Sequence, residues 1–326
     1  MTLTLGKIRG LDALAAANGT FAILAMDHRN SFKRMVAGIL PDAGWDDVAA
    51  EKIRLVSALA PEVTAALFDP IFTAAPVLKA AALPGSHGFL ISRERSGYEE
   101  TPEGRVAVMQ AGWSVEAIKR LGAAGVKLLI HYHPEVGAAA RQREIVAMVA
   151  GECRAHDIAL IVEPVAYRPD GGDMADPAFQ AEMPDIVVET ARALMPLGGD
   201  LLKAEFPAPG ASDEATMRAA CRRLSDAVPQ PWVVLSGGVD FDLFERQLAA
   251  AAAEGASGFL AGRSVWKDAM TIADPAAREA FLAGTARPRM ARLRAIAETA
   301  TPWRARPYAE GMPALAEGWH LAYAGA

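Results

Sequence analysis

Eight short apolar runs rich in strand-forming residues recur along the chain, and longer stretches with helical periodicity separate them. Strands that alternate with helices in this way are typical of a parallel sheet whose crossover connections are helices. Most of the runs are continuously apolar, as expected for strands buried on both faces, and the run at 88–92 is the least clear. The predicted strands cover residues 21–26, 63–68, 88–92, 126–131, 158–163, 200–204, 232–236 and 258–261.

Eight such units in a chain of 326 residues predict an α/β fold, a single closed (β/α)8 TIM barrel, with an open doubly wound sheet as the second choice. One barrel domain is expected to span residues 1–326. From about residue 300 onward, Trp303, Tyr308 and Trp319 predict a tail that packs on the barrel or reaches a partner subunit. The predicted crossover helices include residues 45–59, 114–121, 138–155, 213–227 and 241–253.

The composition argues against several classes of partner. A net charge of −6 leaves no general basic surface for nucleic acid or for an anionic membrane, although a local group of Lys and Arg can still bind a small anion. The two cysteines, Cys153 and Cys221, have no metal-ligand spacing, and the N-terminal residues lack a secretion signal, which favours a cytoplasmic location. No apolar stretch is long enough to span a bilayer, no cofactor is predicted, and we expect a homo-oligomer.

Polar side chains collect at the carboxyl ends of the predicted strands, where barrel enzymes place their catalytic groups. In chain order they are Asp27, His28, Arg29, Asp69, Lys127, His131, Glu163, Lys203, Glu205, Ser236, Gly237, Gly238, Gly262 and Arg263.

Two of these residues, Lys127 and Lys203, stand inside predicted strands, where a lysine is rarely buried. Desolvation and a second nearby ammonium both lower the pKa of an amine, and the neutral amine is the form that attacks a ketone. We therefore expect a Schiff-base chemistry at this pair. The alternative is that each lysine only pairs with Glu163 or Glu205 to close a polar layer of the barrel.

Glu163 and Asp27 are the predicted proton-transfer groups. Glu163 is suited to shuttling protons while a carbinolamine loses water, and Asp27 to accepting the proton of a substrate hydroxyl as the carbon–carbon bond breaks. The alternatives are a structural salt bridge for Glu163 and a helix N-cap for Asp27.

The residues after the last two strands predict a phosphate site. Barrels commonly hold phosphate there, glycines allow the backbone to approach closely, and Arg263 would add a guanidinium able to make two parallel hydrogen bonds. The predicted phosphate-binding residues are Ser236, Gly237, Gly238, Gly262 and Arg263.

His131 and His133 support a rival hypothesis. Residues two apart on a strand point the same way, so this pair could begin a zinc site, with a third ligand from His28, Asp69 or Glu163. A polar loop after a strand explains both histidines equally simply, and our prediction contains no metal.

Several distinctive segments follow one another between about Phe21 and Trp266. They are Ala-Ile-Leu-Ala-Met-Asp-His-Arg, Arg-Ser-Gly-Tyr, Val-Lys-Leu-Leu, Ile-Val-Glu-Pro, Leu-Leu-Lys-Ala-Glu-Phe-Pro, Val-Val-Leu-Ser-Gly-Gly-Val and Gly-Ala-Ser-Gly-Phe-Leu-Ala-Gly-Arg-Ser-Val-Trp. In this order they resemble the class I tagatose 1,6-bisphosphate aldolases of the DeoC/LacD type and their relatives, the sulfofructose phosphate aldolases.

The resemblance implies a metal-independent barrel aldolase that cleaves a phosphorylated ketose to dihydroxyacetone phosphate and a three-carbon aldehyde. The family's Schiff-base lysine falls on Lys203, and its supporting acid, base and lysine fall on Glu163, Asp27 and Lys127. The phosphate of the dihydroxyacetone phosphate portion falls on Ser236, Gly237 and Arg263.

One motif departs from the family pattern, because Asp-Gln-Arg is common where this chain has Asp27-His28-Arg29. Asp-His-Arg occurs in a related group thought to cleave a phosphorylated deoxy-ketogluconate, so that compound is a second candidate substrate. A metal-dependent aldolase and a non-catalytic sugar-phosphate sensor are two further hypotheses for the function of the chain. Further residues predicted to contact substrate are His28, Arg29, Asp69 and His131, with Lys33, Arg93 and Arg95 considered for its far end.

Overall fold

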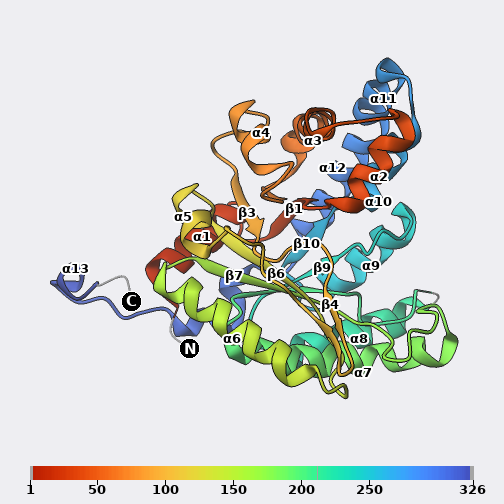
Figure 1. Ribbon diagram of the computed structural model, residues 1–326. Coiled ribbons are helices and arrows are strands. Elements are labelled where there is room, and N and C mark those ends of the chain that lie inside the picture. Colours follow the sequence, from red (N-terminus) through yellow and green to blue (C-terminus); the bar gives the residue numbers. More distant parts are fainter. Residues whose placement is uncertain (1–2, 211, 324–326) are drawn as a thin grey trace.

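A closed barrel of eight parallel strands forms the centre of the computed structural model, which describes residues 3–210 and 212–323. Helices cover the outside of the barrel (Figure 1). All eight predicted strands are confirmed within two residues at each end, including the least clear one, and so is the (β/α)8 fold. Around the barrel, the strands are β1 (Phe21–Met26), β10 (Gly258–Ala261), β9 (Trp232–Leu235), β8 (Leu201–Ala204), β7 (Ala159–Val165), β6 (Gly125–His131), β3 (Gly88–Ser92) and β2 (Ala65–Phe68).

The five predicted crossover helices are also present, as α3 (Trp45–Leu59), α5 (Val115–Arg120), α6 (Ala139–Ala155), α8 (Glu214–Ala227) and α9 (Phe241–Ala253). Their starts follow N-cap chemistry, since Ser114 and Asp213 each accept a hydrogen bond from a backbone N–H of the first turn. The other helices are α1 (Leu5–Leu14), α2 (Asn30–Ile39), α4 (Ala74–Lys79), α7 (Pro177–Leu194), α10 (Arg263–Trp266), α11 (Pro275–Phe281), α12 (Arg287–Ala297) and α13 (Trp319–Ala322).

Alternate residues of each strand point into the barrel, where they form an apolar core that includes Ile23, Leu90, Ile161, Leu201 and Leu260. The same period of two continues toward the carboxyl ends of the strands. It brings four polar residues onto the interior side, above the apolar core: Asp27 after β1, Lys127 in β6, Glu163 in β7 and Lys203 in β8.

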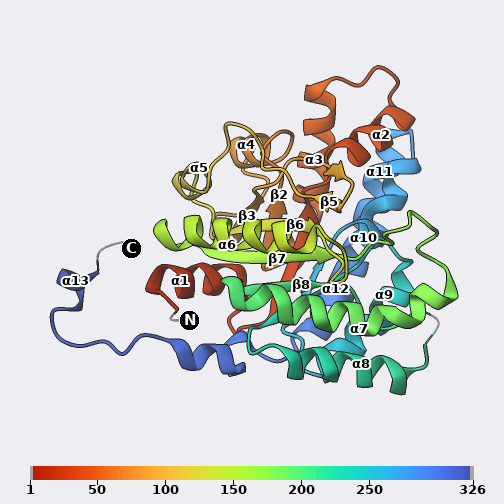
Figure 2. The same cartoon turned by 60° about the horizontal axis from the view of Figure 1, so that its bottom comes forward.

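The amino-terminal end of the barrel is closed by α1 and by the first part of the C-terminal tail. Trp303 is fully buried, and the Tyr308 hydroxyl donates a hydrogen bond to Asp200, which also pairs with Lys7 at 2.8 Å. The tail therefore packs on the barrel at this point. Beyond it, α13 lies at the end of an extended segment that projects from the barrel (Figure 1 and Figure 2). The last three residues of the predicted tail, 324–326, lie outside the described residues.

A small antiparallel hairpin, β4 (Glu99–Thr101) and β5 (Gly104–Val106), follows β3 and was not predicted from the sequence. The Arg105 guanidinium fixes it by stacking on the rings of Tyr98 and Tyr167, at 4.4 and 4.7 Å from their centroids. Within the part of the chain that the structure describes, no helix is long and apolar enough to cross a membrane.

Candidate active site

A cavity of about 350 Å³ opens at the carboxyl ends of the strands, at the lower end of the range for small-molecule sites. Its walls contain most of the predicted site residues, contributed by β1, β6, β7, β8 and the loops after β3, β9 and β10. The residues that line it are Ala25, Asp27, His28, Arg29, Ser31, Glu94, Arg95, Ser96, Gly97, Lys127, Leu129, His131, Glu163, Val165, Lys203, Glu205, Leu235, Ser236, Gly237, Leu260, Gly262 and Arg263.

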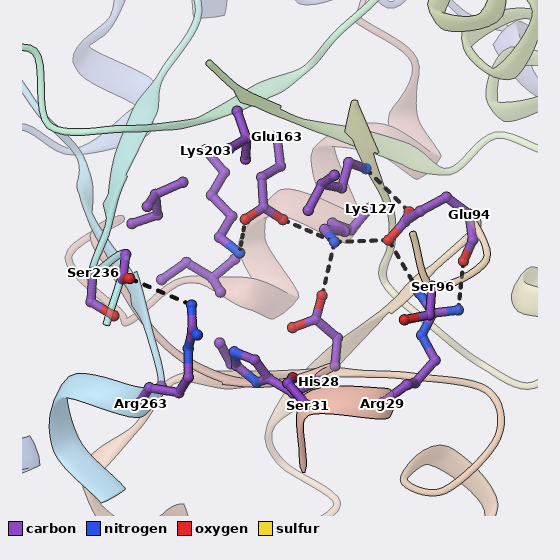
Figure 3. A pocket seen from close by; sticks show the side chains of 18 of the residues that line it. His28, Arg29, Ser31, Glu94, Ser96, Lys127, Glu163, Lys203, Ser236 and Arg263 are labelled. Atoms are coloured by element: carbon purple, nitrogen blue, oxygen red, sulfur yellow. Dashed lines mark hydrogen bonds and ion pairs between the residues drawn. The ribbon is translucent and has the colours of Figure 1, made fainter. Parts of the chain in front are cut away.

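Glu163 lies between the two strand lysines (Figure 3). Its Oε1 is 2.6 Å from Lys203 Nζ, and its Oε2 is 2.9 Å from Lys127 Nζ. The register of the barrel causes this, because Ile161 pairs with Leu201 and the residues two positions further are Glu163 and Lys203. All three side chains are at least nine-tenths buried, so the contacts between their charges are only weakly screened by water.

Lys127 is held by three carboxylates, since Asp27 Oδ2 lies at 2.8 Å and Glu94 Oε1 at 2.9 Å in addition to Glu163. Burial alone lowers the pKa of Lys127, but the carboxylates of Asp27, Glu163 and Glu94 together outweigh burial and hold that pKa well above its ordinary value. The sequence-based expectation of a lowered pKa was wrong for Lys127. Three carboxylates surround this amine, whereas the sequence alternative named only Glu163 or Glu205 as its partner.

Asp27 borders the cavity and faces Lys127. Burial raises the pKa of its carboxyl, but the positive charges of Lys127 and Lys203 outweigh that effect and lower the pKa well below its usual range. Asp27 is not a helix cap, because α2 begins at Asn30 and its N-cap residue, Arg29, makes no side-chain capping bond. The alternative interpretation of Asp27 as a structural cap is therefore wrong.

Glu94 is a member of this network that the sequence prediction missed. It is 3% exposed, its Oε1 contacts Lys127 and Arg29, and its Oε2 accepts the N–H of Leu129. Arg29, a predicted substrate contact, also donates to the Glu94 carbonyl at 2.7 Å. A signal was present in the sequence, because Glu94 continues the interior period of Leu90 and Ser92 on β3.

Glu205 is a second cavity carboxyl with unusual surroundings. Its Oε2 accepts the N–H of Ala166 at 2.7 Å, and among residues 3–210 and 212–323 no cation lies within ion-pair distance of it. Burial raises the pKa of Glu205 to about 7, the N–H of Ala166 opposes the rise, and the charge of Glu163 adds to it. This carboxyl is therefore protonated in a substantial share of molecules at neutral pH.

The predicted phosphate residues gather on another side of the cavity, where Arg263 lies beside Ser236 (Figure 3). Gly237 has a φ of +57°, which favours glycine, and its carbonyl accepts a hydrogen bond from Arg263 at 3.4 Å. Ser236, Gly237, Gly262 and Arg263 line the cavity. Gly238 does not line it, but a Cβ there would lie 3.3 Å from the Arg263 guanidinium carbon, so its lack of a side chain makes room for that group.

No carboxylate in the described part of the chain pairs with Arg263, which leaves its charge available to an anion. The helix that follows, α10, has only four residues, so its dipole adds little to the site. Of the residues considered for the far end of the substrate, Arg95 lines the cavity, whereas Lys33 and Arg93 do not.

Asp69 was predicted to contact substrate, but the structure places it outside the cavity. It is fully buried and pairs with Lys52 of α3, whose Nζ lies 2.5 Å from Asp69 Oδ2. Its other oxygen accepts the N–H groups of Ile71 and Phe72. The strand ends one residue earlier, at Phe68, and the chain turns there, so Asp69 stabilises this turn.

Three histidines were considered for the site, and two of them line the cavity. Burial is the main cause that lowers the pKa of His28 to about 3 and that of His131 to about 4. Both rings are therefore neutral at neutral pH. His133 does not line the cavity, because β6 ends at His131 and the alternation of the strand does not extend to it. Within residues 3–210 and 212–323, no three His, Cys, Asp or Glu side chains are grouped as metal ligands.

A profile of the DeoC/LacD family aldolases matches residues 21–268. Relatives include tagatose 1,6-diphosphate aldolase of Listeria monocytogenes, 30% identical over 83% of this chain and 84% of that protein. Tagatose 1,6-diphosphate aldolase 1 of Enterococcus faecalis is 28% identical over 80% of this chain and 84% of its own. A solved fructose-bisphosphate aldolase of Plasmodium falciparum superposes with a TM-score of 0.69 at 16% identity, covering 92% of this chain and 97% of that one. That likeness concerns the fold alone.

Proposed function

The chain belongs to the DeoC/LacD family of aldolases, and from this premise we propose that it reversibly cleaves a phosphorylated ketose through a Schiff base on Lys203. The substrates that we propose are tagatose 1,6-bisphosphate and sulfofructose 1-phosphate, and dihydroxyacetone phosphate is one product. One observation carries the proposal: Lys203 is a lysine only 4% exposed at the edge of a cavity, with a carboxylate 2.6 Å from its amine.

Glu163 supplies the proton transfers that Schiff-base formation needs. Its Oε1 takes the proton from Lys203, and the free amine then attacks the ketone of the substrate. One N–H proton of the resulting ammonium passes to the former ketone oxygen, which gives the neutral carbinolamine. The protonated Glu163 returns that proton to the carbinolamine hydroxyl, which leaves as water. Lys127 stays protonated because its carboxylate partners stabilise the ammonium, and it keeps Glu163 in place through the 2.9 Å contact with Oε2.

Asp27 is assigned to the hydroxyl on the carbon that becomes the aldehyde. One of its oxygens is bound to Lys127, which leaves the other to accept a hydrogen bond from the substrate. A carboxylate with a lowered pKa is a weak base. Asp27 therefore orients the hydroxyl and accepts its proton only as the carbon–carbon bond breaks, when the hydroxyl becomes more acidic.

The phosphate of the dihydroxyacetone phosphate portion binds at Ser236, Gly237, Gly262 and Arg263. These residues follow β9 and β10, which are the next strands after β8 and its Lys203 around the barrel. This order fits a substrate whose phosphate-bearing carbon is attached directly to the ketone carbon. Arg263 supplies the charge, and the left-handed Gly237 allows the backbone to approach the phosphate oxygens.

The proposal is tested with a panel of ketose phosphates, assayed by coupling dihydroxyacetone phosphate release to NADH oxidation by glycerol-3-phosphate dehydrogenase. Turnover of a ketose phosphate by wild type, lost in Lys203→Met, is the expected result. Binding of these compounds without turnover would instead support the sugar-phosphate sensor.

A phosphorylated deoxy-ketogluconate is the second candidate substrate, because this chain shares Asp27-His28-Arg29 with the related group thought to cleave that compound. The His28 ring lines the cavity next to Asp27, and burial and nearby cations keep it neutral. A neutral imidazole offers a hydrogen bond without an added charge. The same panel separates the two candidates through the ratio of kcat/KM for the two compounds.

Self-association and a cytoplasmic location complete the proposal. Leu315, Trp319 and Leu321 are 59%, 44% and 84% exposed on the projecting C-terminal segment, which favours contact with a second copy. Cys153 and Cys221 are both free and buried, as expected in a reducing compartment. Sedimentation velocity of the full chain and of a variant with Trp319→Ser and Leu321→Ser tests the self-association.

A further inference from the structure

Lys52 of α3 is a fully buried lysine that lies outside the cavity yet contacts its wall from behind. Its Nζ lies 2.8 Å from the Met26 carbonyl oxygen, 2.7 Å from that of His28, 2.5 Å from Asp69 Oδ2 and 2.6 Å from Thr73 Oγ1. An ammonium has three N–H groups, which the two carbonyls and Asp69 use. The hydroxyl of Thr73 then donates its own hydrogen to Asp69 Oδ2 or to the Met26 carbonyl oxygen.

The two carbonyls belong to the residues on either side of Asp27. β1 ends at Met26, so residues 27–29 have no further strand pairing to hold them. Lys52 replaces that pairing with a hydrogen bond to the carbonyl before Asp27 and another to the carbonyl after it. Fixing both carbonyls limits how far the Asp27 side chain can swing away from Lys127.

Stability alone is a weak reason for such a pair. Moving two charges from water into the interior is costly, and well-packed apolar residues of similar volume often serve a fold as well or better. Here the pair of Lys52 and Asp69 is completely enclosed, with further support from the Phe32 ring 5.2 Å from Nζ. What an apolar pair could not supply is the two directed hydrogen bonds to the carbonyls around Asp27.

We propose that Lys52 is a positioning residue for the aldol reaction, which with Asp69 and Thr73 fixes the carbonyls around Asp27 and so keeps the Asp27 carboxylate on Lys127. This inference rests on the proposed function. Loss of Lys52 therefore lowers kcat more than it changes KM, because the phosphate residues lie after β9 and β10 and do not contact Lys52.

A double-mutant cycle with Asp27→Asn separates positioning from a merely structural role. Lys52→Met is expected to lower kcat per folded molecule about tenfold to hundredfold when Asp27 is present, the effect of a small misplacement of a reacting group. In the Asp27→Asn background the same change should lower kcat by less than about threefold. Equal effects in both backgrounds would overturn the proposal. Lys79→Met, at an exposed lysine of α4, is the control and leaves kcat unchanged.

Lys52→Met alone leaves the Asp69 charge buried without its partner and can prevent folding. The variant Lys52→Met with Asp69→Asn removes both charges and keeps an oxygen for the N–H groups of Ile71 and Phe72, so the cycle is repeated with it. Thr73→Val, which retains the ion pair, gives a smaller loss of kcat in the same direction. Full activity per folded molecule in the neutral double variant would also overturn the proposal.

A measurement without substrate tests the position of Asp27 separately from the proposed function. The titratable groups whose charges act on Asp27 include Lys127, Lys203, His28, Glu94 and Lys52, and Lys127 and Lys203 hold the pKa of its carboxyl low. If the carboxylate loses its contact with Lys127, that pKa rises in the neutral double variant, as followed by carboxyl carbon-13 NMR. An unchanged Asp27 pKa would refute the positioning, whereas wild type inactive on every ketose phosphate would refute only the proposed function.

Discussion

Glu205→Gln should make the stability of the protein less dependent on pH. The ordinary glutamate pKa of 4.5 rises in the folded chain to about 7, first through burial and then through the charge of Glu163. Between these two values the unfolded chain is ionised at Glu205 while the folded chain still holds the proton. The folded state therefore loses stability as the pH rises through this window, and above about pH 7 the loss is complete.

The size of the effect follows from the width of the window. A difference of about 2.5 pH units, at 1.36 kcal/mol per unit, corresponds to a loss of about 3 kcal/mol between pH 4.5 and pH 8. Glutamine does not titrate, and its amide oxygen can still accept the N–H of Ala166. The free energy of unfolding of Glu205→Gln relative to wild type should therefore increase by up to about 3 kcal/mol over this range.

Urea unfolding of both proteins at pH 5 and pH 8 measures this difference. The same substitution at Glu182, which is exposed on α7, reports the effect of removing one surface charge. If the difference in unfolding free energy between Glu205→Gln and wild type were the same at both pH values, the pKa of Glu205 would not be raised in the folded chain.

Three further outcomes are expected. Glu163→Gln should fold normally and slow Schiff-base formation by about two to four orders of magnitude; lost stability with normal activity per folded molecule would make Glu163 a structural member only. Arg263→Ala should lower the affinity for phosphorylated ligands about tenfold to hundredfold, and Arg263→Lys should recover part of that affinity. An unchanged inhibition constant for inorganic phosphate in Arg263→Ala would show that Arg263 does not bind the phosphate. Dialysis against a chelator should leave turnover unchanged, whereas a loss restored by zinc would favour a metal-dependent aldolase.

The barrel was predictable from the sequence because burial on both faces gives each strand a continuous apolar run. The less clear run at Gly88–Ser92 is also a strand. The alternation of strands and helices along the chain predicts a strand at this position. The β4 and β5 hairpin could not be predicted in the same way. Each of its two strands has only three residues, and the first strand is polar. The hairpin is held by the stacking of Arg105 on an aromatic ring, a contact that no local sequence pattern indicates.

The site was predictable where a polar residue interrupts an apolar strand, as Lys127, Glu163 and Lys203 do. Glu94 was missed because it stands between two arginines just after a strand and looks like a solvated loop residue. Lys52 was missed because a lysine in an amphipathic helix normally points to water. Asp69 and Lys52 are seventeen residues apart in the chain, and only the packing of α3 behind β1 and β2 brings them together.

Covalent trapping shows which lysine forms the Schiff base, which we assign to Lys203. Wild type, Lys203→Met and Lys127→Met are treated with dihydroxyacetone phosphate and borohydride, and the reduced adduct is located by peptide mass spectrometry. We expect an adduct on the peptide containing Lys203 in wild type, none in Lys203→Met, and a slower reaction still confined to Lys203 in Lys127→Met. Trapping in Lys203→Met at the wild-type level, or an adduct on Lys127, would contradict this assignment.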